Sequence, residues 1–97
     1  MQLMHLFTMT FEFDVEEQPD FIQAVKSLQS FCADRGIEVK LFRDRNRRSR
    51  LYLMFVTEKS VDDVTRLIQE ETPAKEVFRQ MKEANNRVVI SVMDQLV

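Results

Sequence analysis

The 97-residue chain has one cysteine, one histidine, one glycine, two prolines and no tryptophan. The single cysteine, Cys32, excludes an internal disulfide and any metal site built from several cysteines. The single histidine, His5, has no second ligand with which to complete a metal site, so we expect no bound metal. The scarcity of glycine and proline indicates a chain made mostly of regular elements with short connections.

A long apolar run and a strong net charge are also missing. The first 13 residues are apolar but interrupted by polar side chains, and they lack the basic start and cleavage site of a signal peptide. The formal net charge of -2 gives no overall attraction to nucleic acid or to an anionic membrane. We therefore expect one soluble domain over residues 1–97, in the cytoplasm, where the lone thiol stays reduced, and with no membrane segment.

Four segments predict β-strands. Apolar and polar residues alternate in residues 3–13 and 37–41, which is the period of a strand with one buried face. Residues 51–56 are apolar on both faces, as in a central strand. Residues 87–93 form the last strand.

Three segments predict helices. Pro19 suits a first helical turn, apolar residues follow at helical spacing, and Gly36 supplies a left-handed stop. Ser60 has the form of a cap for a second helix. The Thr-Pro pair at residues 72–73 interrupts that segment and starts a third helix, which the two asparagines at 85–86 end.

The predicted order of elements is therefore β-α-β-β-α-α-β. With right-handed crossovers this order gives a ferredoxin-like α+β fold, in which a four-stranded antiparallel sheet has its helices on one face. We expect the first and third strands at the centre of the sheet, because they are the more hydrophobic.

The helices can cover only one face of this sheet. The most apolar alternating set of the first strand goes to the covered face; it comprises Phe7, Met9, Phe11 and Phe13. The other face is still too apolar to lie open, since monomers seldom expose patches beyond roughly a few hundred Å². We therefore expect a homodimer, in which a second copy covers this face. Its expected residues are Met4, Leu6, Thr8, Thr10, Glu12, Phe42, Tyr52, Met54 and Val56, with either Val88, Ile90 and Val92 or Val89 and Met93 from the last strand.

The element order, the broken second helix and the sequence TPAKEVF at residues 72–78 also carry a family likeness. Together they resemble the dimeric α+β barrel superfamily, whose best-known members are similar to antibiotic-biosynthesis monooxygenases. In that family an element of the form Ser/Thr-Pro-x-Phe marks the same helix break. The resemblance implies a dimeric α+β barrel, a homodimer with a cleft between sheet and helices, and does not imply a particular reaction.

The chain departs from the family pattern in two places. Phe55 stands where a tryptophan is common, and the segment from there to Thr72 is longer. Because the chain has no tryptophan, the haem-degrading members of the family, which rely on one, are poor guides to its chemistry. We expect no cofactor.

Five arginines between residues 43 and 50 form the densest cluster of charge. A hairpin turn over residues 44–49, with Asn46 at a positive φ, would place them in water, and we favour this interpretation. The alternative is a phosphate or partner contact through Arg47, Arg48 and Arg50. We do not expect nucleic-acid binding, because it needs a wider basic surface and the helices carry many acidic residues.

His5 and Cys32 are further side chains with reactive groups. We interpret His5 as a hydrogen-bonded residue at the end of the first strand, with a general base in a dimer cleft as the alternative. Cys32 falls on the buried stripe of the first helix, where a thiol behaves as a small apolar group. We expect no chemistry from Cys32.

Residues of the uncovered sheet face could also bind a ligand. Hydroxyl groups lie there among apolar side chains, which is the usual composition of a small-molecule pocket. The candidate ligand-binding residues are Thr8, Thr10, Phe42, Tyr52 and Met54. We favour the simpler interpretation, in which the hydroxyls form hydrogen bonds across a sheet-to-sheet interface.

Three functions follow from these observations. The leading hypothesis is a homodimeric α+β barrel that binds at most a small apolar or aromatic ligand. The second is a cofactor-independent monooxygenase or isomerase for an aromatic or quinone-like substrate, which requires a cavity of roughly 300 Å³ or more and a proton moved by Glu12 or His5. The third is a regulatory or nucleic-acid-associated module that uses the arginine hairpin and loses affinity steeply with salt.

Overall fold

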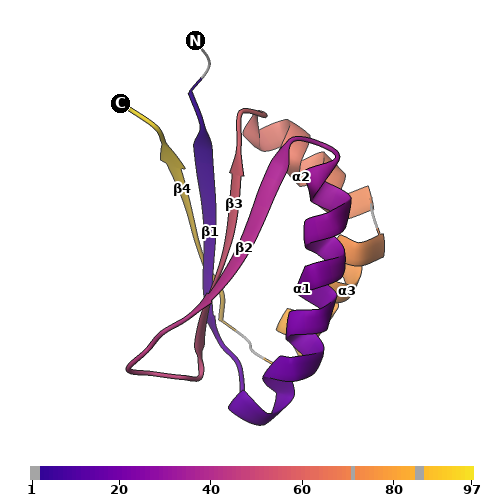
Figure 1. Cartoon of the computed structure of the whole chain (residues 1–97), viewed down its shortest axis with the longest axis vertical. Coiled ribbons are helices and arrows are strands. Elements are labelled where there is room, and N and C mark those ends of the chain that lie inside the picture. The colour runs from indigo at the N-terminus through magenta and orange to yellow at the C-terminus, as the bar shows by residue number, and fades with distance from the viewer. Residues whose placement is uncertain (1–2, 71, 85–86) are drawn as a thin grey trace.

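The computed structural model describes residues 3–70, 72–84 and 87–97, and its elements follow the predicted order. Within these residues, four antiparallel strands form one sheet in the order β2-β3-β1-β4, and the helices lie on one side of it (Figure 1). The ferredoxin-like α+β fold and the central first and third strands are thereby confirmed. The strands are β1 (His5–Glu12), β2 (Ile37–Arg43), β3 (Arg50–Thr57) and β4 (Val89–Asp94); the helices are α1 (Gln18–Ala33), α2 (Val61–Glu70) and α3 (Thr72–Ala84), with a short 3₁₀ turn, η1 (Val15–Glu17), before α1.

The register of the sheet decides which side chains face the helices. Phe7 on β1 lies opposite Phe55 on β3 and Val92 on β4. Because alternate residues of a strand point to opposite faces, Ile90 joins Val92 on the helix side. The open face receives Val89 and Met93 instead, which decides between the two predicted sets from β4.

The core lies between the sheet and the helices, as the alternation of β1 predicts. Phe7, Phe11 and Phe13 are all nearly excluded from water. Phe21 of α1 joins them, with its ring centroid 5.5 Å from that of Phe11 in an edge-to-face contact. Aromatic pairs at such distances add to the free energy gained by burying their surface.

Two turns show how the chain reverses. Gly36, after α1, has a φ of +76°, as predicted for a left-handed stop. No other residue in the described ranges has a positive φ, so the positive φ predicted for Asn46 is wrong. In the β2–β3 hairpin the Asp44 carboxylate instead accepts hydrogen bonds from the backbone N–H groups of Asn46, at 2.8 Å, and Arg47, at 3.1 Å. These bonds hold the turn without the strained conformation.

The predicted signals for α2 and α3 are also found. Ser60 Oγ accepts a hydrogen bond of 3.2 Å from the backbone N–H of Asp63, which caps α2. The helix break is confirmed, since α3 begins at Thr72, directly before Pro73. The asparagines predicted to end α3, residues 85–86, lie outside the described residues. No helix in the described ranges is both long enough and apolar enough to cross a membrane.

The helices cover the two edges of the sheet unequally. On β2, Ile37 and Val39 are buried beneath α1. Every residue of β4 is exposed, and the two that face the helix side, Ile90 and Val92, leave 62% and 47% of their surface open. The gap between β4 and the helices is where the candidate site lies.

Candidate functional site

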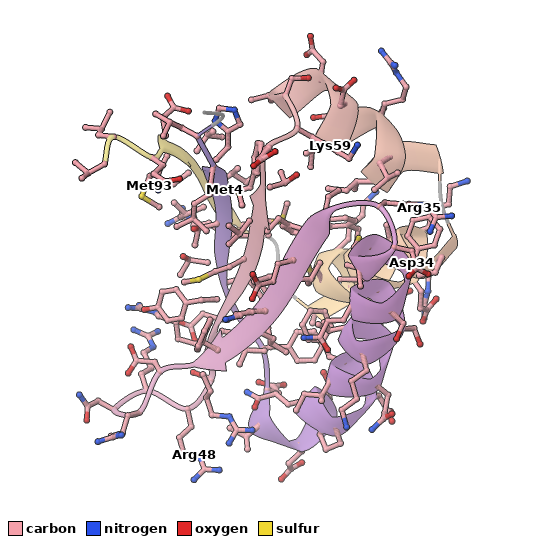
Figure 2. All side chains as sticks on the ribbon, turned by 45° about the horizontal axis from the view of Figure 1, so that its top comes forward. Met4, Asp34, Arg35, Arg48, Lys59 and Met93 are labelled. Carbon is pink, nitrogen blue, oxygen red and sulfur yellow. The ribbon has the colours of Figure 1, made fainter. Side chains whose placement is uncertain are left out.

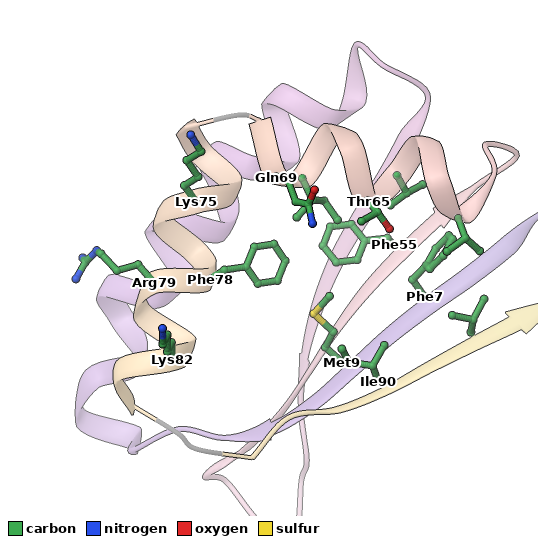
Figure 3. Close-up of a pocket in the computed structure, with 14 residues that line it drawn as sticks. Phe7, Met9, Phe55, Thr65, Gln69, Lys75, Phe78, Arg79, Lys82 and Ile90 are labelled. Carbon is green, nitrogen blue, oxygen red and sulfur yellow. The ribbon is translucent and has the colours of Figure 1, made fainter.

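An apolar cleft of about 640 Å³ lies between the helix side of the sheet and helices α2 and α3 (Figure 3). Phe7 and Phe55 contribute aromatic rings from the central strands, and Met9 lies beside them. Phe78 points from α3 toward Phe55 across the cleft, as Figure 3 shows. Phe55 is fully buried and Phe7 nearly so, whereas Phe78 is only partly buried, so Phe78 supplies most of the aromatic surface that is open in the cleft.

The cleft is open because β4 has no helix packed upon it. Ile90 and Val92 form its β4 wall, and both remain largely exposed in the single chain. On the other side, Val64 of α2 is buried while Ile68 is only partly buried. The fold thus keeps an apolar surface in contact with water, which is the surface that a ligand would cover.

Polar groups are few in the cleft and come from the helices. Thr65 and Gln69 contribute neutral groups from α2, and α3 contributes three cations: Lys75, Arg79 and Lys82. Among the side chains that the structure describes, no histidine, cysteine or carboxylate lines the cleft. The same part of the chain holds no group of three or more metal-ligating side chains. The lining suits the binding of an apolar molecule and supplies no carboxylate–histidine pair for acid–base catalysis.

One of these cations is already paired within α3. Arg79 donates from Nε to Glu76 at 3.0 Å and from Nη1 to Glu83 at 2.8 Å. The hydrogen bond from Arg79 is the main reason why the pKa of Glu76 falls from its ordinary value of 4.5 to about 2. The Arg79 guanidinium points away from Phe78 in Figure 3. Its charge is therefore largely compensated by the two carboxylates.

The candidate ligand residues of the open face lie together, on the other side of the sheet. Thr8 pairs with Met54, and Tyr52 lies between Thr10 and Phe42. In the single chain these residues form a surface rather than part of the large cleft. The Thr8 Oγ1 is buried yet has no hydrogen-bond partner in the described structure. A ligand site or interface on this face stays a prediction.

Glu12, the first of the two candidate proton carriers, is held in ion pairs at the hairpin end of the sheet. Its carboxylate accepts a hydrogen bond of 2.7 Å from Ser49 and lies 2.9 Å from Arg47 and 3.4 Å from Arg50. The Ser49 hydrogen bond lowers the pKa of Glu12 most, desolvation opposes it as the next largest effect, and the two arginines add to the lowering. A lowered pKa makes Glu12 a weaker general base, and it does not line the cleft.

The arginine cluster occupies the hairpin, as the sequence predicts. Figure 2 shows Arg48 projecting from the end of the hairpin, away from the body of the protein, and its side chain is exposed. Arg47 and Arg50 pair with Glu12. A hydrogen bond from the Asn46 backbone is the largest cause of the lowered pKa of Asp44. This arrangement favours the solvated hairpin, while a phosphate or partner contact by Arg47, Arg48 and Arg50 stays a prediction.

His5, the second candidate proton carrier, lies at the opposite end of β1. Its Nδ1 is 2.8 Å from Asp94 Oδ1, which is the hydrogen-bonded strand-end position that the sequence predicts. His5 shares the helix side of the sheet with Phe7 but does not line the cleft. Cys32 is fully buried in α1, and its burial raises the pKa of the thiol despite the nearby Arg35. The raised pKa disfavours the thiolate, because burial outweighs the charge of Arg35.

The cleft residues of α3 were not among the site residues predicted from the sequence. Lys75, Phe78 and Lys82 recur at intervals of three and four residues, which places them on one helical face. That spacing was a usable signal, because the stripe joins an aromatic ring to two cations. The spacing alone does not predict a cleft, because packing of Phe78 in the core explains the aromatic residue equally well.

Comparison with known proteins supports the fold and not a reaction. Neither a family model nor a curated protein matches the chain. Among solved structures, a "putative antibiotic biosynthesis monooxygenase" from Nitrosomonas europaea has a TM-score of 0.79 at 9% identity, over 96% of this chain and 90% of the other. A conserved protein from Methanosarcina mazei gives 0.78 at 15% identity, over 95% and 92%. A second "putative antibiotic biosynthesis monooxygenase", from Bordetella bronchiseptica, gives 0.76 at 16%, over 99% and 100%. The chain is therefore similar in fold to these proteins, which agrees with its predicted resemblance to the dimeric α+β barrel superfamily.

Proposed function

We propose that this protein binds a small, largely apolar organic molecule in the cleft between the sheet and helices α2 and α3, and that it does so as a homodimer. The cleft of about 640 Å³ carries the proposal. Its volume lies within the usual range for small-molecule pockets, roughly 300–1,000 Å³. Its lining of aromatic and aliphatic side chains with few polar groups is also typical of such pockets.

Exposed apolar surface on β4 supports ligand binding further. Ile90 is 62% exposed on the cleft side, although a single chain could have covered it by packing α3 closer. Covering this wall with an apolar ligand removes surface from water, which is favourable by roughly 25 cal/mol for each Å². The open wall therefore provides a driving force for binding.

The open face of the sheet supports the homodimer. Phe42 and Met93 are each 47% exposed there. Met54, on the central strand β3, is partly exposed. Figure 2 shows Met4 and Met93 on the side of the sheet away from α1. A second copy packed on this face would bury these side chains around a two-fold axis.

Blocking the cleft tests the proposed function. Ile90→Trp adds bulk to an exposed position of the wall, so folding is preserved while the space for a ligand shrinks. We expect the affinity for 2-naphthamide, a neutral aromatic probe, to fall at least about tenfold in isothermal titration calorimetry. Gln23→Trp, on the exposed side of α1 and outside the cleft, is the matched control and should bind as the wild type does. Absence of binding to the wild type, or equal binding to Ile90→Trp, contradicts the proposal.

The names of two similar structures suggest a second function, a cofactor-independent monooxygenase or isomerase acting on an aromatic or quinone-like ligand in the same cleft, where neither Glu12 nor His5 is placed to move the proton. The partly exposed ring of Phe78 would orient the flat substrate. Oxygen uptake with a naphthohydroquinone tests the oxygenase form. Uptake above the protein-free rate that is lost in Ile90→Trp and kept in Gln23→Trp supports it, and a rate equal to the protein-free one rejects it.

A further inference from the structure

The charges that line the cleft all have one sign. In the described part of the chain, Lys75, Arg79 and Lys82 are its charged residues, and all three come from α3. The whole sequence has 16 acidic and 14 basic residues, so composition does not explain a lining without a carboxylate. The mouth of the cleft therefore has a positive local potential on a protein whose net charge is negative.

The two lysines contribute most of this potential. Arg79 is bound to Glu76 and Glu83, so its charge is largely compensated. Lys75 and Lys82 form no ion pair with a carboxylate in the described residues. Two ammonium groups without a carboxylate partner among the described residues thus border an apolar cavity, and because both side chains are exposed, salt screens their attraction for an anion.

Lys75 is also placed against the helix dipole. It lies in the first turn of α3, which contains no acidic residue and where the helix terminus already carries a partial positive charge. Its interaction with the helix dipole is unfavourable. Lys82 lies in the last turn, where a cation is favourable, and it needs no ligand to account for it. A bound anion near Lys75 would remove the local conflict.

The distance between the two lysines along α3 matches the apolar surface that lies between them. Seven residues of helix separate Lys75 from Lys82 by about 10.5 Å along the axis. Phe78 lies between them and points toward Phe55, as Figure 3 shows. An apolar body resting on the partly exposed Phe78 ring and on Ile90 would have an ammonium group near either end of the α3 wall. Lysine side chains are long and flexible enough to donate a charge-assisted hydrogen bond to such a ligand.

From these observations we infer that the cleft selects an organic anion: a molecule with a flat or branched apolar body and one acidic group, such as an aromatic carboxylate or a phenolate. This inference rests on the proposed function and names the class of its ligand. The apolar body supplies most of the affinity by burial, and the acidic group, held by Lys75 or Lys82, decides which apolar molecules bind best.

Two probes of nearly equal size separate the charge from the apolar contribution. The carboxylate 2-naphthoate and the neutral 2-naphthamide are titrated against the protein by calorimetry at low salt and at 0.5 M salt. We expect naphthoate to bind roughly tenfold more tightly at low salt, and the preference to shrink at high salt because partly exposed charges are screened. The naphthamide affinity should change little with salt.

Two double variants of equal net charge test the residues. Lys75→Gln with Lys82→Gln should remove the preference for naphthoate, so that the two probes bind with equal affinity. Lys26→Gln with Lys59→Gln changes two exposed lysines away from the cleft and should keep the preference. Equal affinity of the wild type for the two probes, or equal loss of the preference in both double variants, overturns the inference while the proposed function stands. Failure of both probes to bind, or binding unaffected by Ile90→Trp, overturns the proposed function and the inference together.

Discussion

The two edge strands of the sheet have similar apolar content and opposite surroundings. On β2, Ile37 and Val39 are 2% and 5% exposed beneath α1, and Gln29 of α1 donates a hydrogen bond of 2.8 Å to the Val39 carbonyl. On β4, every residue from Val89 to Asp94 is exposed. The helix side of β2 is covered by the chain itself, whereas β4 keeps apolar side chains on both faces in contact with water.

This difference shows that the hydrophobicity of a strand indicates that its apolar face has to be covered but does not indicate which surface covers it. For β2 the cover is α1, which follows β1 directly in the sequence and packs against both β2 and α3. For β4 the proposed cover comes from outside the chain: a ligand on the cleft side and a second copy on the open side. The exposed edge is thus the part of the sheet on which the proposed functions depend.

The largest expected effect comes from comparing one isoleucine on each edge. Ile37→Ala leaves a cavity beneath α1 and should lower the free energy of unfolding by about 3 kcal/mol. Ile90→Ala removes a side chain that is already 62% exposed and should lower it by at most about 0.5 kcal/mol. Urea unfolding of the two variants, without ligand, measures both values. Equal losses would contradict the unequal cover of the two edges.

A second expected effect separates the two faces of β4. Val92 and Met93 are adjacent and equally exposed, at 47% each, but face the cleft and the open side respectively. Met93→Lys should weaken the proposed homodimer by roughly 30-fold or more, because a charge would be buried in the interface. Sedimentation velocity over a range of protein concentrations measures the dissociation constant.

Val92→Lys is the matched control for the dimer, because its side chain faces away from the proposed interface. It should leave the dissociation constant of the dimer unchanged and instead weaken the binding of 2-naphthamide. A wild-type protein that sediments as a monomer at high concentration would reject the homodimer, and an equal effect of both lysines would reject the assigned interface.

The smallest expected effect concerns α3, the helix that borders the uncovered side of the cleft. Arg79 lowers the pKa of Glu76 from 4.5 to about 2, so their pairing stabilises the fold fully above about pH 5. That stabilisation is lost as the pH falls from about 4.5 to 2, when Glu76 becomes protonated in the folded state as well. Glu76→Gln should therefore be slightly less stable than the wild type at pH 6, and the difference should be much smaller at pH 2, where about half of Glu76 is protonated in the folded state.

Urea unfolding at both pH values measures this difference. Arg79→Gln removes the partner and should abolish the same pH dependence, which serves as the check on the assignment. A Glu76→Gln variant whose stability relative to the wild type is the same at pH 2 and pH 6 would contradict the pairing.

The alternation of β1 and the breakers at Gly36 and residues 72–73 were sufficient to predict the elements and their order. Such signals are local, because a strand face or a helix end depends on residues only a few positions apart. The candidate site was harder to predict. Thr8 and Tyr52 do lie on one face of the sheet, as expected, but the large cleft lies on the other face. The sequence marks Phe78 as an apolar helical residue in either case, whether it closes a core or lines a cleft.

By itself the sequence determined the strands, the helices, the ferredoxin-like order and the apolar character of both sides of β4. The tertiary structure alone decided that α1 covers β2, that α2 and α3 stand away from β4, and that Lys75 and Lys82 border the resulting cleft. The physical reason is that the hydrophobic effect is non-directional: it favours covering an apolar face but does not specify which surface covers it. The packing of helices that are distant in the sequence makes that choice.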